Sequence, residues 1–206
     1  MINRTGAVEA FWLNEEIECY FKNNLVYVRI RKNASTFYTN LFVSNGRTGI
    51  QFKDINWNIH HVFGFIQDPI VRYCKGLTED LFKDSLEFAE KVTSILTKTP
   101  INSAVLTYHT IPISLMVGDR MYEMTWITLD SDISSKQQLD KFCSQHNVFL
   151  NWDHDILSHP SNPEKINFFN NVKVSLGTGN HVFWRVLAKD IDLYNQVLAE
   201  SKNILN

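Results

Sequence analysis

Apolar and polar positions along the chain follow a strand period in some segments and a helix period in others. Residues 25–31 alternate apolar side chains with tyrosine and arginine, the two-residue period of a half-buried β-strand. Residues 36–43 carry their apolar side chains at near-helical spacing until Asn45-Gly46 ends the pattern. The intervening Lys-Asn-Ala-Ser at 32–35 is therefore predicted to form a strand-to-helix turn.

The second predicted strand, at 61–67, is almost continuously apolar. Such a run is typical of a central strand in a parallel sheet that is covered on both faces. Asp68-Pro69 follows directly, and an aspartate before a proline is a favourable start for a helix. A longer helix is predicted at 79–97, where apolar residues recur at helical spacing.

The remaining patterns predict a short helix at 7–21, a strand at 122–129, a helix at 135–146 and a helix at 180–200. The apolar face predicted for the last helix consists of Phe183, Leu187, Ile191, Tyr194 and Leu198. Strands that alternate with helices indicate an α/β fold with a largely parallel central sheet flanked by helices. Because no linker-like segment divides the 206 residues, we expect a single domain over 1–206.

Composition and charge narrow the range of partners. A hydrophobic content of 44% is enough for an ordinary folded core. The 20 basic and 22 acidic residues give a net charge of −2, so no basic footprint for nucleic acid or a membrane surface is present. We expect neither partner, and an anionic ligand would have to be held by a local cluster of groups.

Cysteine usage and the N-terminal sequence favour a cytoplasmic protein. Cys19, Cys74 and Cys143 are odd in number, widely spaced and without a C-x-x-C pattern, which is typical of reduced thiols rather than of disulfides or a zinc site. The first residues lack the basic and apolar regions of a signal peptide.

The first predicted strand-to-helix turn carries candidate anion-binding chemistry. The start of a helix offers backbone N–H groups and the positive end of the helix dipole. Ser35 and Thr36 add hydroxyl groups there, and Lys32 adds a mobile positive charge. The turn is not a Walker loop, because the glycines are absent and the lysine precedes the turn. The alternative is a helix-capping serine beside an exposed lysine.

The second turn, which begins at Gln67, has a similar ambiguity. Arg72 and Lys75 lie in the predicted helix that follows it, and they would face water in an ordinary capped helix. Ligands of open α/β sheets sit beyond the carboxyl ends of the strands. Because both turns follow strands of one predicted sheet, they are candidates to face a single bis-phosphorylated ligand.

These segments resemble the nucleotide-binding motifs of the sulfotransferases. VYVRIRKNASTFYTNLF resembles the family's 5′-phosphosulfate loop, a strand followed by K-x-x-[SC]-T, and HHVFGFIQDPIVRYCKGL is similar to its 3′-phosphate segment, R-D-P-x-x-R-x-x-S after an apolar strand. The stretch from His109 to Pro112 is similar to the H-x-x-P of carbohydrate-type members, and 186–197 to their C-terminal helix. The resemblance spans about 25–198 and implies the P-loop-like sulfotransferase architecture.

The resemblance also implies a co-substrate, 3′-phosphoadenosine 5′-phosphosulfate. Its 5′-phosphosulfate would be held by Lys32, Asn33, Ala34, Ser35 and Thr36. Gln67 and Lys75 stand where the family has the arginine and serine that hold the 3′-phosphate. Arg72 matches the motif's second arginine, for which a structural role is the alternative.

Sulfuryl transfer needs in-line attack by a hydroxyl, a base for its proton and a cation beside the leaving phosphate. Lys32 is the predicted cation, and the acceptor would be a hydroxyl of a sugar or small metabolite. His109 is the candidate base because imidazole titrates near neutrality, with a structural histidine as the alternative and His60 and His61 as weaker candidates.

Two rival functions remain at this level. A non-catalytic module that keeps the fold and binds a nucleotide or a partner is favoured by Gln67 and Lys75, whereas a nucleotide kinase is disfavoured by the missing Walker glycines. The Asp and His residues at 153–159 lack a fixed ligand spacing, so a solvated loop is expected there and no metal. Gly-Thr-Gly at 177–179 is interpreted as a turn.

Overall fold

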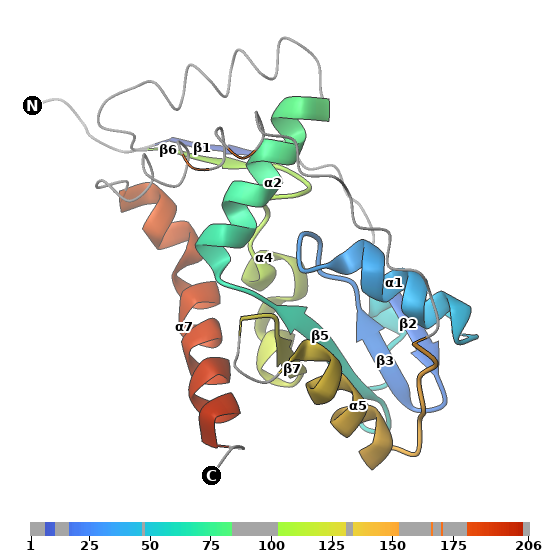
Figure 1. Cartoon of the computed structure of the whole chain (residues 1–206). Helices are drawn as coiled ribbons and strands as arrows, with labels where there is room; N and C mark the ends of the chain where they lie inside the picture. Colours follow the sequence, from blue (N-terminus) through green and yellow to red (C-terminus); the bar gives the residue numbers. More distant parts are fainter. Residues whose placement is uncertain are drawn as a thin grey trace, which may run out of the picture.

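A five-stranded mixed β-sheet forms the centre of the computed structural model, with the strands in the spatial order β4-β2-β3-β5-β7 (Figure 1). The structure describes residues 7–10, 17–46, 48–83, 103–130, 134–152, 166, 170 and 181–203. The strands of this sheet are β2 (Glu18–Lys22), β3 (Leu25–Val28), β4 (Thr48–Gln51), β5 (His61–Ile66) and β7 (Thr125–Thr128). Strand β2 is antiparallel to both β3 and β4, whereas β3, β5 and β7 are parallel.

The three parallel strands end at the same edge of the sheet. In the register of these strands Val26 lies opposite Val62, and Phe65 lies opposite Ile127. The segments that follow β3, β5 and β7 therefore emerge side by side, which is where ligands bind in open α/β sheets.

One face of the sheet carries an aromatic core under α1 (Ser35–Ser44) and α5 (Ser135–Gln145). Alternate residues of β3 and β5 point to this face, among them Tyr27, Phe63 and Phe65. The ring of Tyr38 on α1 stacks on Phe65 with 3.5 Å between ring centroids. Leu139 of α5 completes this layer.

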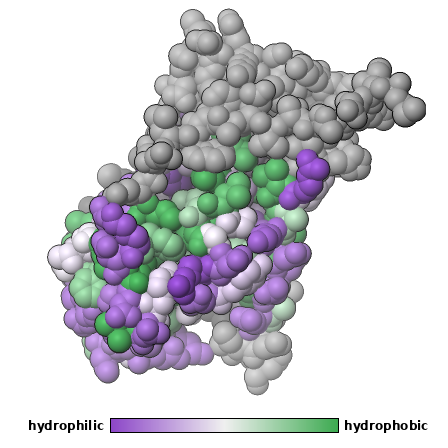
Figure 2. Space-filling model, turned by 180° about the vertical axis from the view of Figure 1, so that it is seen from behind, coloured by the Kyte–Doolittle hydropathy of each residue, from purple (hydrophilic) through white to green (hydrophobic). Residues whose placement is uncertain are grey.

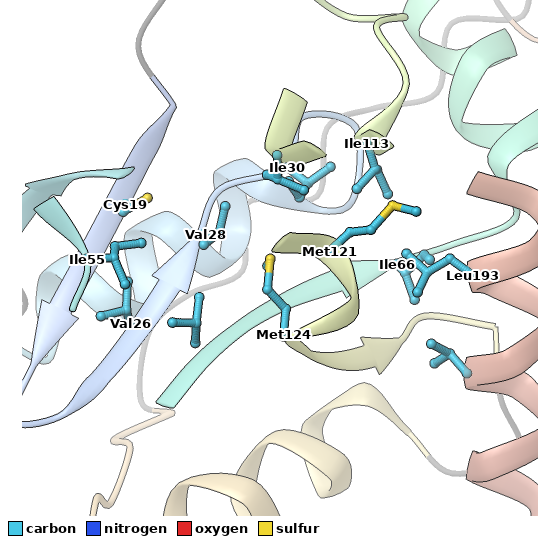
Figure 3. Packing of buried hydrophobic residues seen from close by; sticks show 13 residues of the cluster. Cys19, Val26, Val28, Ile30, Ile55, Ile66, Ile113, Met121, Met124 and Leu193 are labelled. Atoms are coloured by element: carbon cyan, nitrogen blue, oxygen red, sulfur yellow. The ribbon is translucent and has the colours of Figure 1, made fainter. Parts of the chain in front are cut away.

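The opposite face is aliphatic and is covered by α4 (Ile113–Val117), the 3₁₀ helix η2 (Gly118–Tyr122) and α7 (His181–Asn203). Val28 of β3 and Ile66 of β5 belong to one cluster with Met121 and Leu193, and Figure 3 shows Ile66 next to Leu193 of α7. The two clusters use opposite faces of the same strands, which explains why the sequence of β5 is apolar at nearly every position.

Two elements extend beyond this core. Helix α2 (Pro69–Lys83) begins directly after β5 and contacts α7. Strands β1 (Ala7–Ala10) and β6 (Ser103–Leu106) form a separate parallel pair, which lies near the N-terminal end of α7 in Figure 1. A short 3₁₀ helix, η1 (Phe52–Asp54), follows β4.

The structure confirms the predicted α/β class and most of the predicted elements. The parallel arrangement holds for β3, β5 and β7, but the sheet as a whole is mixed. The helix predicted at 7–21 is wrong, because this stretch contains β1 and β2. Cys19 and Phe21 pack on one face of the sheet, and Asn23, with a left-handed φ of 56°, turns the chain into β3.

Two helix predictions need adjustment. The first predicted helix after β5 does not end before 79 but continues as α2 to Lys83, and 84–100 lies outside the described residues. In α7 the predicted face is confirmed at Leu187, whereas Ile191, Tyr194 and Leu198 are only half-buried. The buried positions of α7 in the described part are Leu187, Asp190, Leu193, Val197 and Ser201.

The cysteines of the described chain are not joined by disulfides. Cys19, Cys74 and Cys143 are all buried. On the face drawn in Figure 2, hydrophilic residues cover much of the described surface, and a band of hydrophobic residues borders the part drawn in grey. None of the described helices has the length and apolar character that crossing a membrane requires.

Gly76 tests the packing of α2 against the turn after β6. A Cβ atom at Gly76 would lie 2.4 Å from the backbone oxygen of His109, so Gly76→Ala must displace backbone. We expect this substitution to lower the free energy of unfolding by about 1–3 kcal/mol, although alanine favours a helix by about 1 kcal/mol over glycine. Gly49→Ala is the control, because a Cβ there meets nothing within 4 Å. Equal stability of the two variants in urea denaturation would contradict the packing.

Candidate functional site

The turn between β3 and α1 is built from residues in an unusual backbone conformation. Lys32 has φ 62° and Ala34 has φ 52°, both in the left-handed region that costs a non-glycine residue roughly 1–2 kcal/mol. This conformation curls the chain back toward the edge of the sheet and starts α1 at Ser35. The predicted strand-to-helix turn is thus confirmed, and strained backbone takes the place of the glycines.

Asn33 fixes this turn to the neighbouring strand. Its side chain is fully buried, and its amide nitrogen donates to the carbonyl oxygen of Phe65 on β5 at 2.6 Å. A buried amide that satisfies a strand carbonyl holds the turn in one position relative to β5. Asn33 was predicted to bind ligand, but its amide nitrogen is used to anchor the turn.

Helix α1 begins without a side-chain cap. Ala34 occupies the capping position and offers no hydroxyl, so the alternative of a capping serine is wrong. Ser35 is the first helical residue and is buried, whereas Thr36 is exposed. The N–H groups of this first turn and the Thr36 hydroxyl are therefore the groups of α1 best placed to meet a ligand.

The turn after β5 is held by a capping aspartate. The Asp68 carboxylate accepts hydrogen bonds from the N–H groups of Ile70 at 2.7 Å and Val71 at 3.1 Å, as its sequence position predicts. The N–H of Asp68 in turn donates to the Asp130 carboxylate at 2.7 Å, which links this turn to the end of β7.

Gln67 connects the two turns. Its side-chain nitrogen donates to the carbonyl oxygen of Lys32, and its side-chain oxygen accepts a hydrogen bond from the Lys75 ammonium at 2.8 Å. Gln67 is only 2% exposed, so its amide spans the gap between the turns. Partial burial lowers the pKa of Lys75, and the charge of Asp130 opposes that shift.

The side chain of Lys32 meets a carboxylate that the sequence analysis did not single out. Its ammonium lies 3.6 Å from Glu79 Oε2, and both side chains are 21% exposed. Lys32 is therefore not the fully exposed lysine expected of an open turn. Glu79 is four residues after Lys75 and seven after Arg72, a spacing that places all three on one side of α2.

Arg72 lies beneath the site and is fully buried. Its guanidinium donates to the carbonyl oxygens of Arg31 at 3.1 Å and Ile111 at 2.7 Å, and it approaches the sulfur of Met116 at 3.8 Å. Burial lowers the pKa of Arg72 to about 10, against the opposing charge of Asp190, so the group stays charged at neutral pH. These contacts support the structural alternative for Arg72 rather than contact with a ligand.

His109 sits in the turn that follows β6. This turn is closed by the Thr107 and Thr110 side chains, and the N–H of His109 donates to Thr107 Oγ1 at 3.1 Å. The adjacent Tyr108 ring lies 3.1 Å beneath the Arg31 guanidinium, which places the His109 turn beside the Lys32 turn. His109 is half-buried, and nothing in these contacts assigns it a proton-transfer role.

Asp130 and Tyr194 complete the described edge. The Tyr194 hydroxyl donates to Asp130 Oδ2 at 3.2 Å. Burial, together with the charge and hydrogen bond of Asp130, raises the pKa of Tyr194 to about 12. Asp130 could have been identified from the sequence, because it comes just after the strand predicted at 122–129.

The structure thus gathers most, but not all, of the predicted residues. The residues that it brings to this edge of the sheet are Lys32, Asn33, Ala34, Ser35, Thr36, Gln67 and Lys75, with Arg72 beneath them. His60 and His61 lie at the opposite edge, at the start of β5, where the rings of His61 and His146 lie 3.9 Å apart and are tilted by 32°. The stretch 153–159 and the Gly-Thr-Gly at 177–179 lie outside the described residues.

Two described cavities are lined by other residues. One of ≈ 460 Å³ adjoins α5 at Lys136 and Trp152, and one of ≈ 480 Å³ adjoins β2 and β4 at Glu18 and Gln51. Glu18 also accepts a hydrogen bond from Arg31 at 3.2 Å. Within the described part of the chain, clusters of three or more potential metal ligands are absent.

Comparisons with protein-family models, curated proteins and solved structures find no match to this chain. The site must therefore be interpreted from its own geometry.

Arg72 is expected to be essential for stability. Arg72→Met should lower the free energy of unfolding by about 3–5 kcal/mol. The substitution leaves two carbonyl oxygens without their hydrogen-bond donor and the buried carboxylate of Asp190 without the opposite charge. Arg72→Lys keeps the positive charge but not the geometry that lets a guanidinium donate to both carbonyls. Its free energy of unfolding should lie between those of Arg72→Met and wild type. Arg185→Met on the exposed side of α7 is the control, expected within about 0.5 kcal/mol of wild type. A stable Arg72→Met protein would show that the buried guanidinium is dispensable.

Proposed function

We propose that this chain is a sulfotransferase-like enzyme that transfers a sulfuryl group from 3′-phosphoadenosine 5′-phosphosulfate to a hydroxyl of a sugar or small metabolite. The observation that carries the proposal is the Lys32 turn. It presents an uncapped helix start, the exposed Thr36 hydroxyl and a lysine ammonium at the carboxyl edge of adjacent parallel strands. These are the groups that a transferring phosphosulfate needs.

The described residues offer more binding groups for the 5′-phosphosulfate of the donor than for its 3′-phosphate. Thr36, the N–H groups of α1 and Lys32 suit the 5′-phosphosulfate. At the 3′-phosphate position Gln67 is buried and already bonded to the Lys32 carbonyl, which leaves Lys75 as the nearest cation. We therefore propose that Lys75 contacts the 3′-phosphate and that Gln67 aligns Lys75.

The proposed reaction is an in-line displacement. The acceptor oxygen forms a bond to sulfur as the bond from sulfur to the bridging phosphate oxygen breaks, and the electron pair leaves with 3′-phosphoadenosine 5′-phosphate. His109 takes the acceptor proton, since its turn lies beside the Lys32 turn through the Arg31–Tyr108 contact. Lys32 stabilises the charge that grows on the bridging oxygen, a stabilisation that is largest in the transition state.

A non-catalytic nucleotide-binding or partner-binding module is the second candidate. It is favoured by the Lys32–Glu79 ion pair and by the inward-facing Gln67, because both occupy groups that a donor would need. The two candidates differ in turnover rather than in binding.

Donor binding is the first expectation. Saturating 3′-phosphoadenosine 5′-phosphate should raise the melting temperature and release or absorb heat in calorimetry, since a ligand of the native state stabilises it by mass action. ATP serves as the control for a nucleotide with its phosphates arranged differently. The absence of both heat and a thermal shift would overturn the donor assignment for the enzyme, while leaving open a module that binds a protein.

Lys32 should contribute more to turnover than to affinity. Lys32→Asn removes the charge while asparagine tolerates the left-handed backbone, so the fold should survive. We expect donor hydrolysis to 3′-phosphoadenosine 5′-phosphate to slow by at least ~10²-fold, the scale of losing one preorganised electrostatic donor. Donor affinity should change much less.

Lys189→Asn provides the matched control. Lys189 is exposed on α7 and pairs with Asp119 at 3.3 Å, so its loss removes an equal charge and an ion pair elsewhere. If wild type and Lys32→Asn hydrolyse the donor at the same rate, Lys32 has no catalytic role and the non-catalytic module is the better account.

A further inference from the structure

The candidate site holds more carboxylates than a strongly anionic ligand would favour. Lys32 and Lys75 supply its ammonium groups, whereas Asp68, Glu79 and Asp130 supply carboxylates at the same edge. Arg31 does not shift this balance, because Glu18 Oε1 accepts a hydrogen bond from its guanidinium at 3.2 Å. A bis-phosphorylated nucleotide approaching this edge therefore meets opposing charges as well as the two ammonium groups.

Among these carboxylates Glu79 has a distinct position. Asp68 is used by the N–H groups at the start of α2, and Asp130 accepts from the Asp68 N–H and the Tyr194 hydroxyl. Glu79 instead faces the side chain of Lys32, the cation assigned to the transferring group, at 3.6 Å. Both partners are largely shielded from water, so this ion pair is screened less than a surface pair.

We propose that Glu79 is a specificity-determining residue, which makes anion binding at Lys32 an exchange of one carboxylate for another anion and penalises ligands in proportion to their charge. This inference rests on the proposed function, because it assumes that Lys32 meets the anionic group of the ligand. When that group displaces Glu79, the carboxylate remains a few ångströms away and repels the remaining negative charges. A neutral hydroxyl next to the bound anion is not repelled and can donate to Glu79.

The proposal explains an otherwise unfavourable arrangement. A helix that runs past an anion site usually gains from cations there, yet α2 places a carboxylate against the site lysine. The pairing keeps Lys32 oriented over the turn in the absence of ligand, which reduces the rotamer freedom that the lysine would lose on binding. Its cost is lower affinity for every anion, and the cost is greatest for bisphosphates.

The test compares Glu79→Gln with wild type against ligands of graded charge. The probes are inorganic phosphate, adenosine 5′-monophosphate and 3′-phosphoadenosine 5′-phosphate, followed by thermal shift and calorimetry. Glu79→Gln should bind the bisphosphate about tenfold more tightly, a change equivalent to about 1.4 kcal/mol, and the monophosphate by a smaller factor. Glu123→Gln is the charge-matched control: Glu123 pairs with Arg120 at 2.5 Å before β7, at the opposite edge of the sheet, and its variant should bind all three probes as wild type does.

A double-mutant cycle separates exchange at Lys32 from general repulsion. In a Lys32→Asn background, Glu79→Gln should improve binding by clearly less than it does in wild type, because the Lys32–Glu79 ion pair is already absent there. Equal gains in both backgrounds would overturn the exchange. Equal affinity of Glu79→Gln and wild type for all three probes would overturn the proposal as a whole.

The outcomes also distinguish this inference from the proposed function. If Glu79→Gln tightens phosphate binding but neither protein binds the bisphosphate nucleotide, the role of Glu79 stands and the sulfuryl-donor assignment fails. If the nucleotide binds both proteins equally, the donor assignment stands and the role of Glu79 fails. If no probe binds any variant, both fail.

Discussion

The buried guanidinium of Arg72 is the constraint on which the arrangement of the candidate site depends. Taking a cation out of water costs several kcal/mol unless hydrogen bonds and an opposite charge compensate it. Here the compensation comes from the Arg31 and Ile111 carbonyls and from the charge of Asp190. Because these groups belong to separate segments, satisfying one cation fixes the positions of all of them.

Asp190 extends this constraint to the far side of the molecule. It is fully buried on α7, and its carboxylate accepts hydrogen bonds from the N–H groups of Ile113 at 2.6 Å and Ser114 at 2.9 Å. The first turn of α4 is therefore held by α7 rather than by a local cap. The segment from Ile111 to Ser114 is hydrogen-bonded to Arg72 at one end and to Asp190 at the other. These bonds fix α2, α4 and α7 relative to the turn that carries Lys32.

The sequence predicts the parts of this arrangement that depend on local pattern. The strand at 61–67 and the capping role of Asp68 follow from apolar continuity and from the proline after the aspartate, and both are confirmed. The helix expected at 7–21 fails because its apolar spacing is compatible with both periods, and only the pairing of β2 with β3 and β4 decides between them.

The candidate site is less predictable than the fold. Residues 32–36 and Lys75 follow from their places after strands, but the pairing of Lys32 with Glu79 depends on how α2 is rotated about its axis. That rotation is set by the buried side chain of Arg72, which belongs to α2 itself, and by the close approach of Gly76 to the backbone of His109. Neither the burial of Arg72 nor the close approach of Gly76 can be recognised from the spacing of residues in the sequence. For this reason the sequence alone leaves Arg72 as a candidate ligand-binding residue.

The left-handed backbone at Lys32 has a consequence for how this chain can be altered. Glycine and asparagine adopt that conformation at lower cost than lysine does, so a library selected only for thermal stability should drift toward them at position 32. Selection for a function of the ammonium group would oppose that drift. The side chain selected at position 32 under each condition therefore shows whether the cost of the left-handed backbone or the positive charge of the ammonium group determines which residue is retained there.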